Sequence, residues 1–457
     1  MKKISLLIVC LCALFGAQAQ TVTIIDDQTL LPIQGVQVFK WNDGYAFAIS
    51  GEDGIVQLKD ISEANELYFI KEGYINYYAT LATLNKVGFT VKMSEKYNEM
   101  QEVVVSASRF EEKKKDVSQK IQVIGSKELQ KMNQTSTADV LANSGNVMVQ
   151  KSQLGGGSPI IRGFETNKVL IVLDGIRMNN AIYRGGHLQN VITMDNSIMD
   201  RVEIVFGPGS VVYGSDALGG VMSFTTKKPT LSYSDKVVVK ANAYTRYMSA
   251  VNGYAAHANV SVGGKKFGSL TSFTFSQFGD LRQGANREPS VGNFGARPWY
   301  VQQFNGKDSM VVNADTNLQV GSGYSQYDLL QKFLFKQNEF VKHTVNFQYS
   351  TSSNIDRYDR LTLMSGSKPK FGEWYYGPQK RLLASYTLEL SKPTKLYEKA
   401  RFVVGYQQIE ESRIDRRFQK VDQNNRIENL DIISANLDFA KQIGKNEIRY
   451  GLEGWYI

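Results

Sequence analysis

From residue 230 onward the chain repeats short segments in which apolar and polar residues alternate. In the segment 381–390, for example, Leu382 and Ala384 alternate with Arg381 and Ser385. A period of two places the two sets on opposite faces of a strand. Apolar residues on one face and polar residues on the other are typical of the lipid and lumen sides of a membrane β-barrel. We count nine such segments: 236–249, 256–262, 270–278, 327–336, 343–351, 381–390, 400–408, 432–440 and 448–456.

The connections between these segments also alternate. After the second segment they run short, long, short, long, short, long and short: 263–269, 279–326, 337–342, 352–380, 391–399, 409–431 and 441–447. Bacterial outer-membrane barrels have short turns on the periplasmic side and longer loops outside the cell. The pattern therefore predicts antiparallel hairpins with all long loops at one end.

The N-terminus has the pattern of a cleavable secretory signal. Residues 1–3 form a basic n-region with Lys2 and Lys3, residues 4–15 form an apolar run, and Ala17-Gln18-Ala19 is a small-x-small cleavage site. The run is shorter than the roughly 20 residues that a membrane-spanning helix needs. We expect residues 1–19 to be removed and the mature chain to begin at Gln20.

Both cysteines, Cys10 and Cys12, lie inside this signal. The mature chain is therefore predicted to contain no cysteine, which excludes disulfides, thiolate metal sites and cysteine nucleophiles. Loss of two signal lysines lowers the formal charge from +9 to +7. No basic block with interleaved aromatic residues indicates nucleic-acid binding.

Residues 20–95 are predicted to form a small β-sandwich. Short β-rich runs at 21–25, 36–40, 66–70 and 88–93 are separated by turn signals. The sequence contains the segments IIDDQTLLPIQGVQVF, GEDGIVQL and FIKEGY, which resemble segments of carboxypeptidase-regulatory-like domains. The segment contains no histidine, so we interpret it as an interaction or spacer module rather than a peptidase.

Two glycine-rich strings carry the most specific signal: IRGFETNKVLIVLDGIRMNN (161–180) and RVEIVFGPGSVVYGSDALGGVMSF (201–224). Both closely resemble the plug domain of TonB-dependent outer-membrane receptors, which import iron chelates, haem or vitamins. Asp174-Gly175 reads as a tight turn after a buried strand. A phosphate-binding loop is disfavoured because Gly155-Gly156-Gly157 lacks a following Lys-Ser/Thr.

This resemblance implies a domain order for the whole chain. We expect a signal peptide at 1–19, the sandwich at 20–95, a TonB box and linker at 96–116, an α+β plug at 117–229, and barrel strands at 230–457. Plugged transporters have about 22 strands, and this chain stops within a strand. The predicted fold class is mainly β, with an incomplete antiparallel transmembrane barrel of about nine of about 22 strands.

The segment before the plug resembles a TonB box. It comprises Glu102, Val103, Val104, Val105, Ser106, Ala107 and Ser108. A short β-branched run on a polar tether can add as a strand to a partner's sheet. The charged run 111–116 that follows is interpreted as a compliant linker.

The resemblance also implies ion pairs between plug and barrel. In the family, arginines matching Arg162 and Arg201 pair with barrel glutamates, and buried charges of this kind need partners. The matching late-barrel glutamates are not found within these 457 residues.

The ligand is predicted from one segment and three side chains of the plug. Residues 178–195 look most like receptors for haem and iron chelates. Tyr183, Arg184 and His187 lie in a glycine-rich loop, where Tyr or His could ligate iron and Arg could bind a carboxylate or catecholate oxygen. An ordinary hydrogen-bonding role for the lone His187 stays open.

Three classes of function account for different parts of this sequence. A passive porin explains only the strands, and a secreted adhesin, other binding protein or enzyme explains only the signal and the sandwich. A TonB-dependent importer in the outer membrane, driven by TonB with its ExbB/ExbD motor, explains all features together. No catalytic set, intrinsic metal site or cofactor is predicted. Cobalamin, a glycan or another non-iron ligand remains the alternative to haem or an iron siderophore.

Overall fold

The computed structural model describes residues 20–27, 29–40, 48–58, 61, 66–94, 103–182, 191–232 and 234–457. The chain divides into two compact units, Met1–Glu102 and Val103–Ile457. The predicted signal at 1–19 lies outside the described residues, so it stays a prediction.

The N-terminal unit is a two-sheet sandwich. One sheet has the order β4-β1-β7 and the other β3-β2-β5-β6. Val22, Ile24, Val38 and Phe69 are fully buried in its hydrophobic core. The elements are β1 (Gln20–Asp26), β2 (Gln37–Lys40), β3 (Ala48–Ile49), β4 (Ile55–Leu58), β5 (Glu66–Ile70), β6 (Tyr77–Thr80), α2 (Leu81–Lys86) and β7 (Thr90–Met93). Its kinship with carboxypeptidase-regulatory-like domains stays a prediction.

The segment 109–232, here called the plug, is built on a mixed five-stranded sheet of order β10-β16-β17-β14-β15. β14 is buried at every position because it lies inside this sheet beneath the helices. No helix among the described residues is long and apolar enough to cross a membrane. The sheet strands are β10 (Lys120–Gly125), β14 (Val169–Leu173), β15 (Ile176–Arg177), β16 (Met199–Phe206) and β17 (Gly220–Thr226); a second sheet contains β11 (Met148–Gln150), β12 (Ser158–Ile161) and β13 (Phe164–Glu165). The helices are α3 (Ser126–Met132), α4 (Thr137–Asn143) and α5 (Ser210–Tyr213), with 3-10 turns η1 (Lys114–Asp116), η2 (Thr166–Lys168), η3 (Asn196–Ile198) and η4 (Ser215–Ala217).

The tight turn predicted at Asp174-Gly175 is confirmed. It joins Leu173 of β14 to Ile176 of β15 in a two-residue hairpin. Asp174 has φ +51° and Gly175 has φ +89°, and left-handed conformation at both central residues favours Asp-Gly. A Cβ at Gly175 would lie 2.6 Å from Nη2 of Arg401, so this turn also permits close approach of the neighbouring strand.

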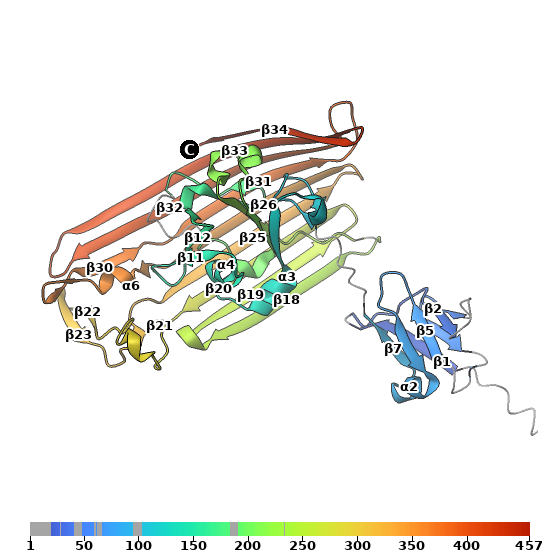
Figure 1. Cartoon of the computed structure of the whole chain (residues 1–457), viewed down its shortest axis with the longest axis horizontal. Helices are drawn as coiled ribbons and strands as arrows, with labels where there is room; N and C mark the ends of the chain where they lie inside the picture. Colours follow the sequence, from blue (N-terminus) through green and yellow to red (C-terminus); the bar gives the residue numbers. More distant parts are fainter. Residues whose placement is uncertain are drawn as a thin grey trace, which may run out of the picture. The chain divides into compact units, whose positions relative to one another are not determined.

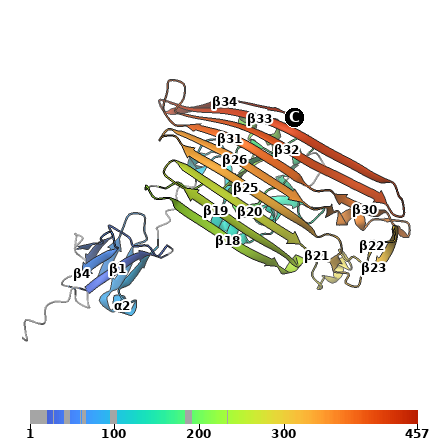
Figure 2. The same cartoon turned by 180° about the vertical axis from the view of Figure 1, so that it is seen from behind.

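Nine long antiparallel strands form the wall, a sheet with the plug against one face (Figure 1, and from behind in Figure 2). Each overlaps one of the nine predicted segments, which confirms the predicted strands. The predicted long connection 409–431 is wrong, because the strand before it continues to Arg417 and the strand after it begins at Gln423. In order they are β18 (Val238–Met248), β19 (Gly253–Gly263), β20 (Phe267–Phe278), β25 (Tyr324–Lys336), β26 (Val341–Ser352), β31 (Lys380–Leu390), β32 (Lys399–Arg417), β33 (Gln423–Ile443) and β34 (Asn446–Tyr456).

The wall is polar on the plug side and apolar on the other. Along β19 buried and exposed residues alternate without a break. The buried set includes His257 and Asn259, whereas Tyr254 and Val260 are exposed. In a water-soluble sheet the apolar face is buried and the polar face is exposed. Here the apolar face is exposed and the polar face is buried, as in the strands of a membrane barrel.

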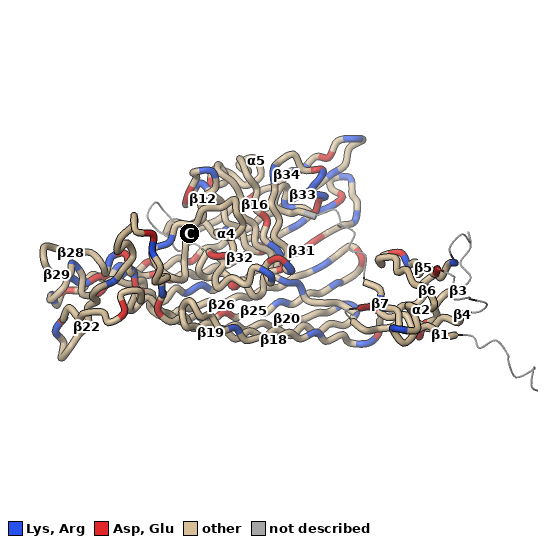
Figure 3. Tube along the Cα trace, turned by 60° about the horizontal axis from the view of Figure 1, so that its bottom comes forward, with Lys and Arg blue, Asp and Glu red and all other residues tan. Residues whose placement is uncertain are grey.

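Smaller elements crowd one end of the wall, here called the long-loop end. Both basic and acidic residues occur along these loops, near β22, β28 and β29 in Figure 3. β30 pairs with the far part of β32 and with β27, so the sheet extends beyond the hairpins. The elements are β21 (Leu281–Arg282), η6 (Pro289–Val291), β22 (Trp299–Phe304), β23 (Lys307–Val312), β24 (Leu318–Gln319), β27 (Ile355–Asp356), α6 (Tyr358–Leu361), β28 (Met364–Ser365), β29 (Lys368–Pro369) and β30 (Phe371–Tyr376), with η5 (Ser249–Val251) in the β18–β19 turn.

Candidate functional site

The described part of the predicted box packs onto the plug. β8 (Val103–Val104) pairs with β9 (Glu112–Lys113), and Val104 is fully buried. Residues 103–116 are thus folded here, in contrast to the expected compliant tether. Glu102 lies outside the described residues.

A single buried carboxylate holds the box segment. Oε2 of Glu203, on β16, accepts hydrogen bonds from the backbone N–H groups of Val105 at 2.9 Å and Ser106 at 2.7 Å. Its Oε1 lies 2.8 Å from Nε of Arg201. Glu203 is fully buried, so its charge depends on these three contacts for stabilisation.

Arg109 ties the end of the box segment to the wall. Its guanidinium pairs with Asp438 of β33 at 3.3 Å and with Glu453 of β34. It also lies 4.7 Å from the ring centre of Tyr213. Burial alone would lower the pKa of Arg109, but attraction by Glu453 and Asp438 raises it above the usual value. Arg109 is therefore a fixed cation at the boundary between box, plug and wall.

Arg177 shares the same wall carboxylate. Its Nη2 lies 3.3 Å from Oε1 of Glu453, and its Nη1 pairs with Asp216 of the plug at 2.9 Å. Its guanidinium stacks 4.6 Å from the ring of Trp455. Two plug arginines thus converge on β34 through Glu453.

A second buried ion pair joins the plug to the middle of the wall. Oδ2 of Asp174 lies 3.1 Å from Nζ of Lys332 on β25. The same carboxylate accepts hydrogen bonds from Asn346 at 3.1 Å and Gln348 at 3.0 Å on β26. The backbone N–H of Thr226 donates to Oδ1 at 2.9 Å. The predicted turn therefore presents its aspartate to the wall.

Replacing Asp174 with asparagine is expected to lower stability by on the order of 3 kcal/mol, because it leaves the buried Lys332 ammonium without its counter-charge. Asparagine keeps the left-handed turn, so the charge is the property tested. Calorimetric unfolding measures the loss. Asp216→Asn is the matched control, since Arg177 retains Glu453 and the loss should be smaller. Equal losses in both variants would contradict a buried pair at Asp174.

The arginines predicted to pair with the barrel have other neighbours in the described part of the structure. Arg201 pairs with Glu203 of its own strand, and the guanidinium of Arg162 lies 5.8 Å from the ring centre of Phe206. Their pairing with barrel glutamates stays a prediction. The plug–wall pairs described above use other residues. Tyr183, Arg184 and His187 lie outside the described residues, so their role in ligand capture also stays a prediction.

Sequence reasoning did not single out Arg109, Arg177 or Asp174 as partners of the wall. A usable signal exists for two of them. Arg177 and Asp174 interrupt an otherwise apolar run, 169–178, and a charge in a buried strand requires a partner. Arg109 carries no comparable signal.

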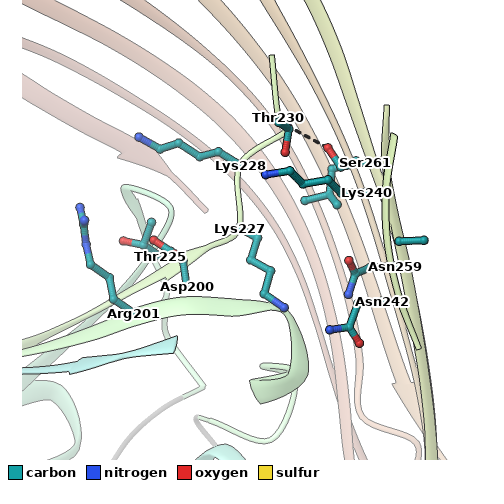
Figure 4. Close-up of a pocket in the computed structure, with 12 residues that line it drawn as sticks. Asp200, Arg201, Thr225, Lys227, Lys228, Thr230, Lys240, Asn242, Asn259 and Ser261 are labelled. Atoms are coloured by element: carbon teal, nitrogen blue, oxygen red, sulfur yellow. Dashed lines mark hydrogen bonds between the residues drawn. The ribbon is translucent and has the colours of Figure 1, made fainter. Parts of the chain in front are cut away.

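A cavity of about 530 Å³ lies between the plug and the first wall strands (Figure 4). Lys227 and Lys228 reach it from the end of the plug, and Lys240, Asn242 and Asn259 from β18 and β19. Burial lowers the pKa of Lys227, against the attraction of Asp195 and Asp200. Within the described ranges no group of three or more His, Cys, Asp or Glu side chains could hold a metal.

Known proteins match the plug and the sheet. Residues 113–221 match the family described as the TonB-dependent Receptor Plug Domain. Vitamin B12 transporters BtuB of Vibrio vulnificus are 36% identical over 164 residues (strain CMCP6) and 31% identical over 179 residues (strain YJ016). These alignments cover 35% and 38% of this chain and 26% of each relative. The matched part is thus about a quarter of those relatives.

Solved structures share the fold at low identity. The copper transporter OprC aligns with a TM-score of 0.55 at 13% identity, covering 73% of this chain and 45% of its own. A ferric enterobactin receptor (PfeA) mutant from Pseudomonas aeruginosa aligns with a TM-score of 0.54 at 14% identity, covering 78% and 50%. Residues 113–221 therefore form a TonB-dependent receptor plug domain, and the described plug and wall share their fold with the OprC and PfeA structures.

Proposed function

We propose that the protein is a TonB-dependent receptor of the outer membrane that actively imports a scarce ligand. The observation that carries the proposal is the plug match at 113–221, on a segment that lies against the polar face of an antiparallel wall. A plug held by buried ion pairs closes a pore, so passage requires work on the plug. A passive porin does not account for this arrangement.

Energy enters through the box segment in this proposal. Val103 to Ser108 leave their site on the plug and, together with Glu102, add as a strand to TonB, which the ExbB/ExbD motor pulls. In the folded state two charge-assisted hydrogen bonds to Glu203 hold the segment. Bonds of this kind contribute about 1.5–3 kcal/mol each. Typical coupling between binding sites is about 1–3 kcal/mol, enough for a bound ligand to shift the segment toward release.

The proposed ligand is haem or an iron–siderophore complex, captured by Tyr183, Arg184 and His187. Cobalamin is the second candidate, because the BtuB relatives share the plug region at up to 36% identity. The N-terminal sandwich is proposed to be a periplasmic interaction module.

Growth of a deletion strain tests the proposal. Haem, a ferric siderophore and cobalamin are supplied in turn as the limiting nutrient, with and without the gene. Gene-dependent growth on haem or the siderophore is expected. Growth dependent on the gene only with cobalamin would favour the second candidate, and no dependence with any nutrient would overturn import of these ligands.

A further inference from the structure

A second cavity lies at the long-loop end, away from the plug contacts. Its volume is about 240 Å³. Loops 279–323 and 353–379 enclose it, and the side chains used below are Arg297, Tyr300, Asp356, Glu373, Trp374 and Tyr375. The cavity combines one guanidinium, two carboxylates and three aromatic rings.

Arg297 is held rigidly by its backbone. Its N–H donates to the carbonyl of Thr316 at 2.8 Å, and its own carbonyl accepts from the side-chain amide of Asn313 at 2.8 Å. The residue is only 3% exposed. These bonds fix the backbone position from which the Arg297 side chain reaches the cavity.

Two nitrogens of the Arg297 guanidinium lack hydrogen-bond partners in the described part of the chain. Nε and Nη1 of Arg297 have no hydrogen-bond partner among the described residues. Burial lowers the pKa of Arg297, against the attraction of Asp356 and Asp280. Leaving donors of a buried charge unpaired costs free energy, so such a group requires an explanation.

Two neighbouring arginines show the contrast. Arg416 binds both oxygens of Asp308 at 2.7 Å and also pairs with Glu373 at 2.9 Å. Arg357 makes two hydrogen bonds to Asp359, at 2.9 and 2.7 Å. The same loops therefore satisfy two guanidinium groups through neighbouring carboxylates and leave that of Arg297 available.

We propose that this cavity binds an anionic oxygen group, a carboxylate or phosphate, of an organic ligand whose apolar part contacts Tyr300 and Trp374. A guanidinium fork matches the two oxygens of such a group, and the aromatic rings supply apolar contact area. The ligand class rests on the proposed import function, whereas the binding site rests on Arg297 and its surroundings alone.

Asp356 adds a pH dependence to this site. Burial raises the pKa of Asp356 to about 6, with Arg297 acting in the opposite direction and Asp280 and Glu373 raising it further. Above this pH the Asp356 carboxylate is ionised, balances Arg297 and repels an anion. Below it the carboxyl is neutral, so we expect anion binding to tighten as pH falls from about 7.5 to about 5.

Calorimetric titration of the purified protein in detergent tests the inference. The probes are haemin and ferric citrate, which carry carboxylates, and cyanocobalamin, which carries a phosphodiester. At least one should bind, and Arg297→Gln should weaken that binding about tenfold or more. The matched control is Arg282→Gln, because Arg282 pairs with Asp315 on the same loop and is half exposed. Which probe binds separates the two anion classes.

A second variant, Asp356→Asn, tests whether weaker binding by Arg297→Gln could result from misfolding. It should strengthen binding at about pH 7.5 and abolish the pH dependence, a gain that damage to the fold does not produce. Binding of no probe, or unchanged affinity in Arg297→Gln, overturns the inference. Neither result affects the proposed import function, which fails only if the gene supports growth on none of the limiting nutrients.

Discussion

Replacing Val104 with proline is expected to abolish uptake while leaving ligand binding at the surface intact. Proline removes a backbone donor from the strand that would add to TonB. Val104 lies in β8 and is fully buried against the plug, far in sequence from the loops that meet ligand first. The measurement is energised uptake of labelled ligand by whole cells, compared with binding to de-energised cells.

The control variant carries a proline at a nearby position where proline does not disturb the backbone. Lys114 is the first residue of η1, and the first position of a helical turn tolerates proline. Lys114→Pro should transport at close to the normal rate. Normal uptake by Val104→Pro, or loss of binding together with uptake, would show that the segment is not the point where energy enters.

Replacing Glu203 with alanine is expected to release the box segment without ligand. The change leaves the backbone N–H groups of Val105 and Ser106 and the Arg201 guanidinium without their shared carboxylate. Breaking a buried pair in this way costs about 3–5 kcal/mol. Since proteolysis of a transiently opened segment follows its open population, trypsin cleavage after Arg109 should accelerate by about a hundredfold or more.

Mass spectrometry of timed digests measures that cleavage. Glu128→Ala, at an exposed position on α3, is the matched control and should digest as the parent does. Glu203→Gln, which keeps an oxygen acceptor but no charge, should fall between the two. Cleavage after Arg109 at the parent rate in Glu203→Ala would mean that other contacts hold the segment.

Local sequence pattern was sufficient for the strands and for one turn. Alternation has a period of two regardless of distant partners, so all nine wall strands could be located from the chain alone. Asp174-Gly175 could be recognised because a two-residue hairpin requires left-handed backbone at both positions. The glycine-rich strings predicted the plug through their resemblance to a known domain.

Tertiary structure decided which charges meet. Arg109 reaches Glu453 across 344 residues, and Asp174 reaches Gln348 across 174. The folded position of Val104 depends on Glu203, about one hundred residues later. Arg297 appears as an ordinary loop arginine in the sequence, and only the fold shows that two of its side-chain nitrogens have no hydrogen-bond partner among the described residues. Strand periodicity is a property of the local backbone, whereas ion pairs and cavities depend on register and closure between distant segments, so the sequence by itself determined the elements and the structure determined the site.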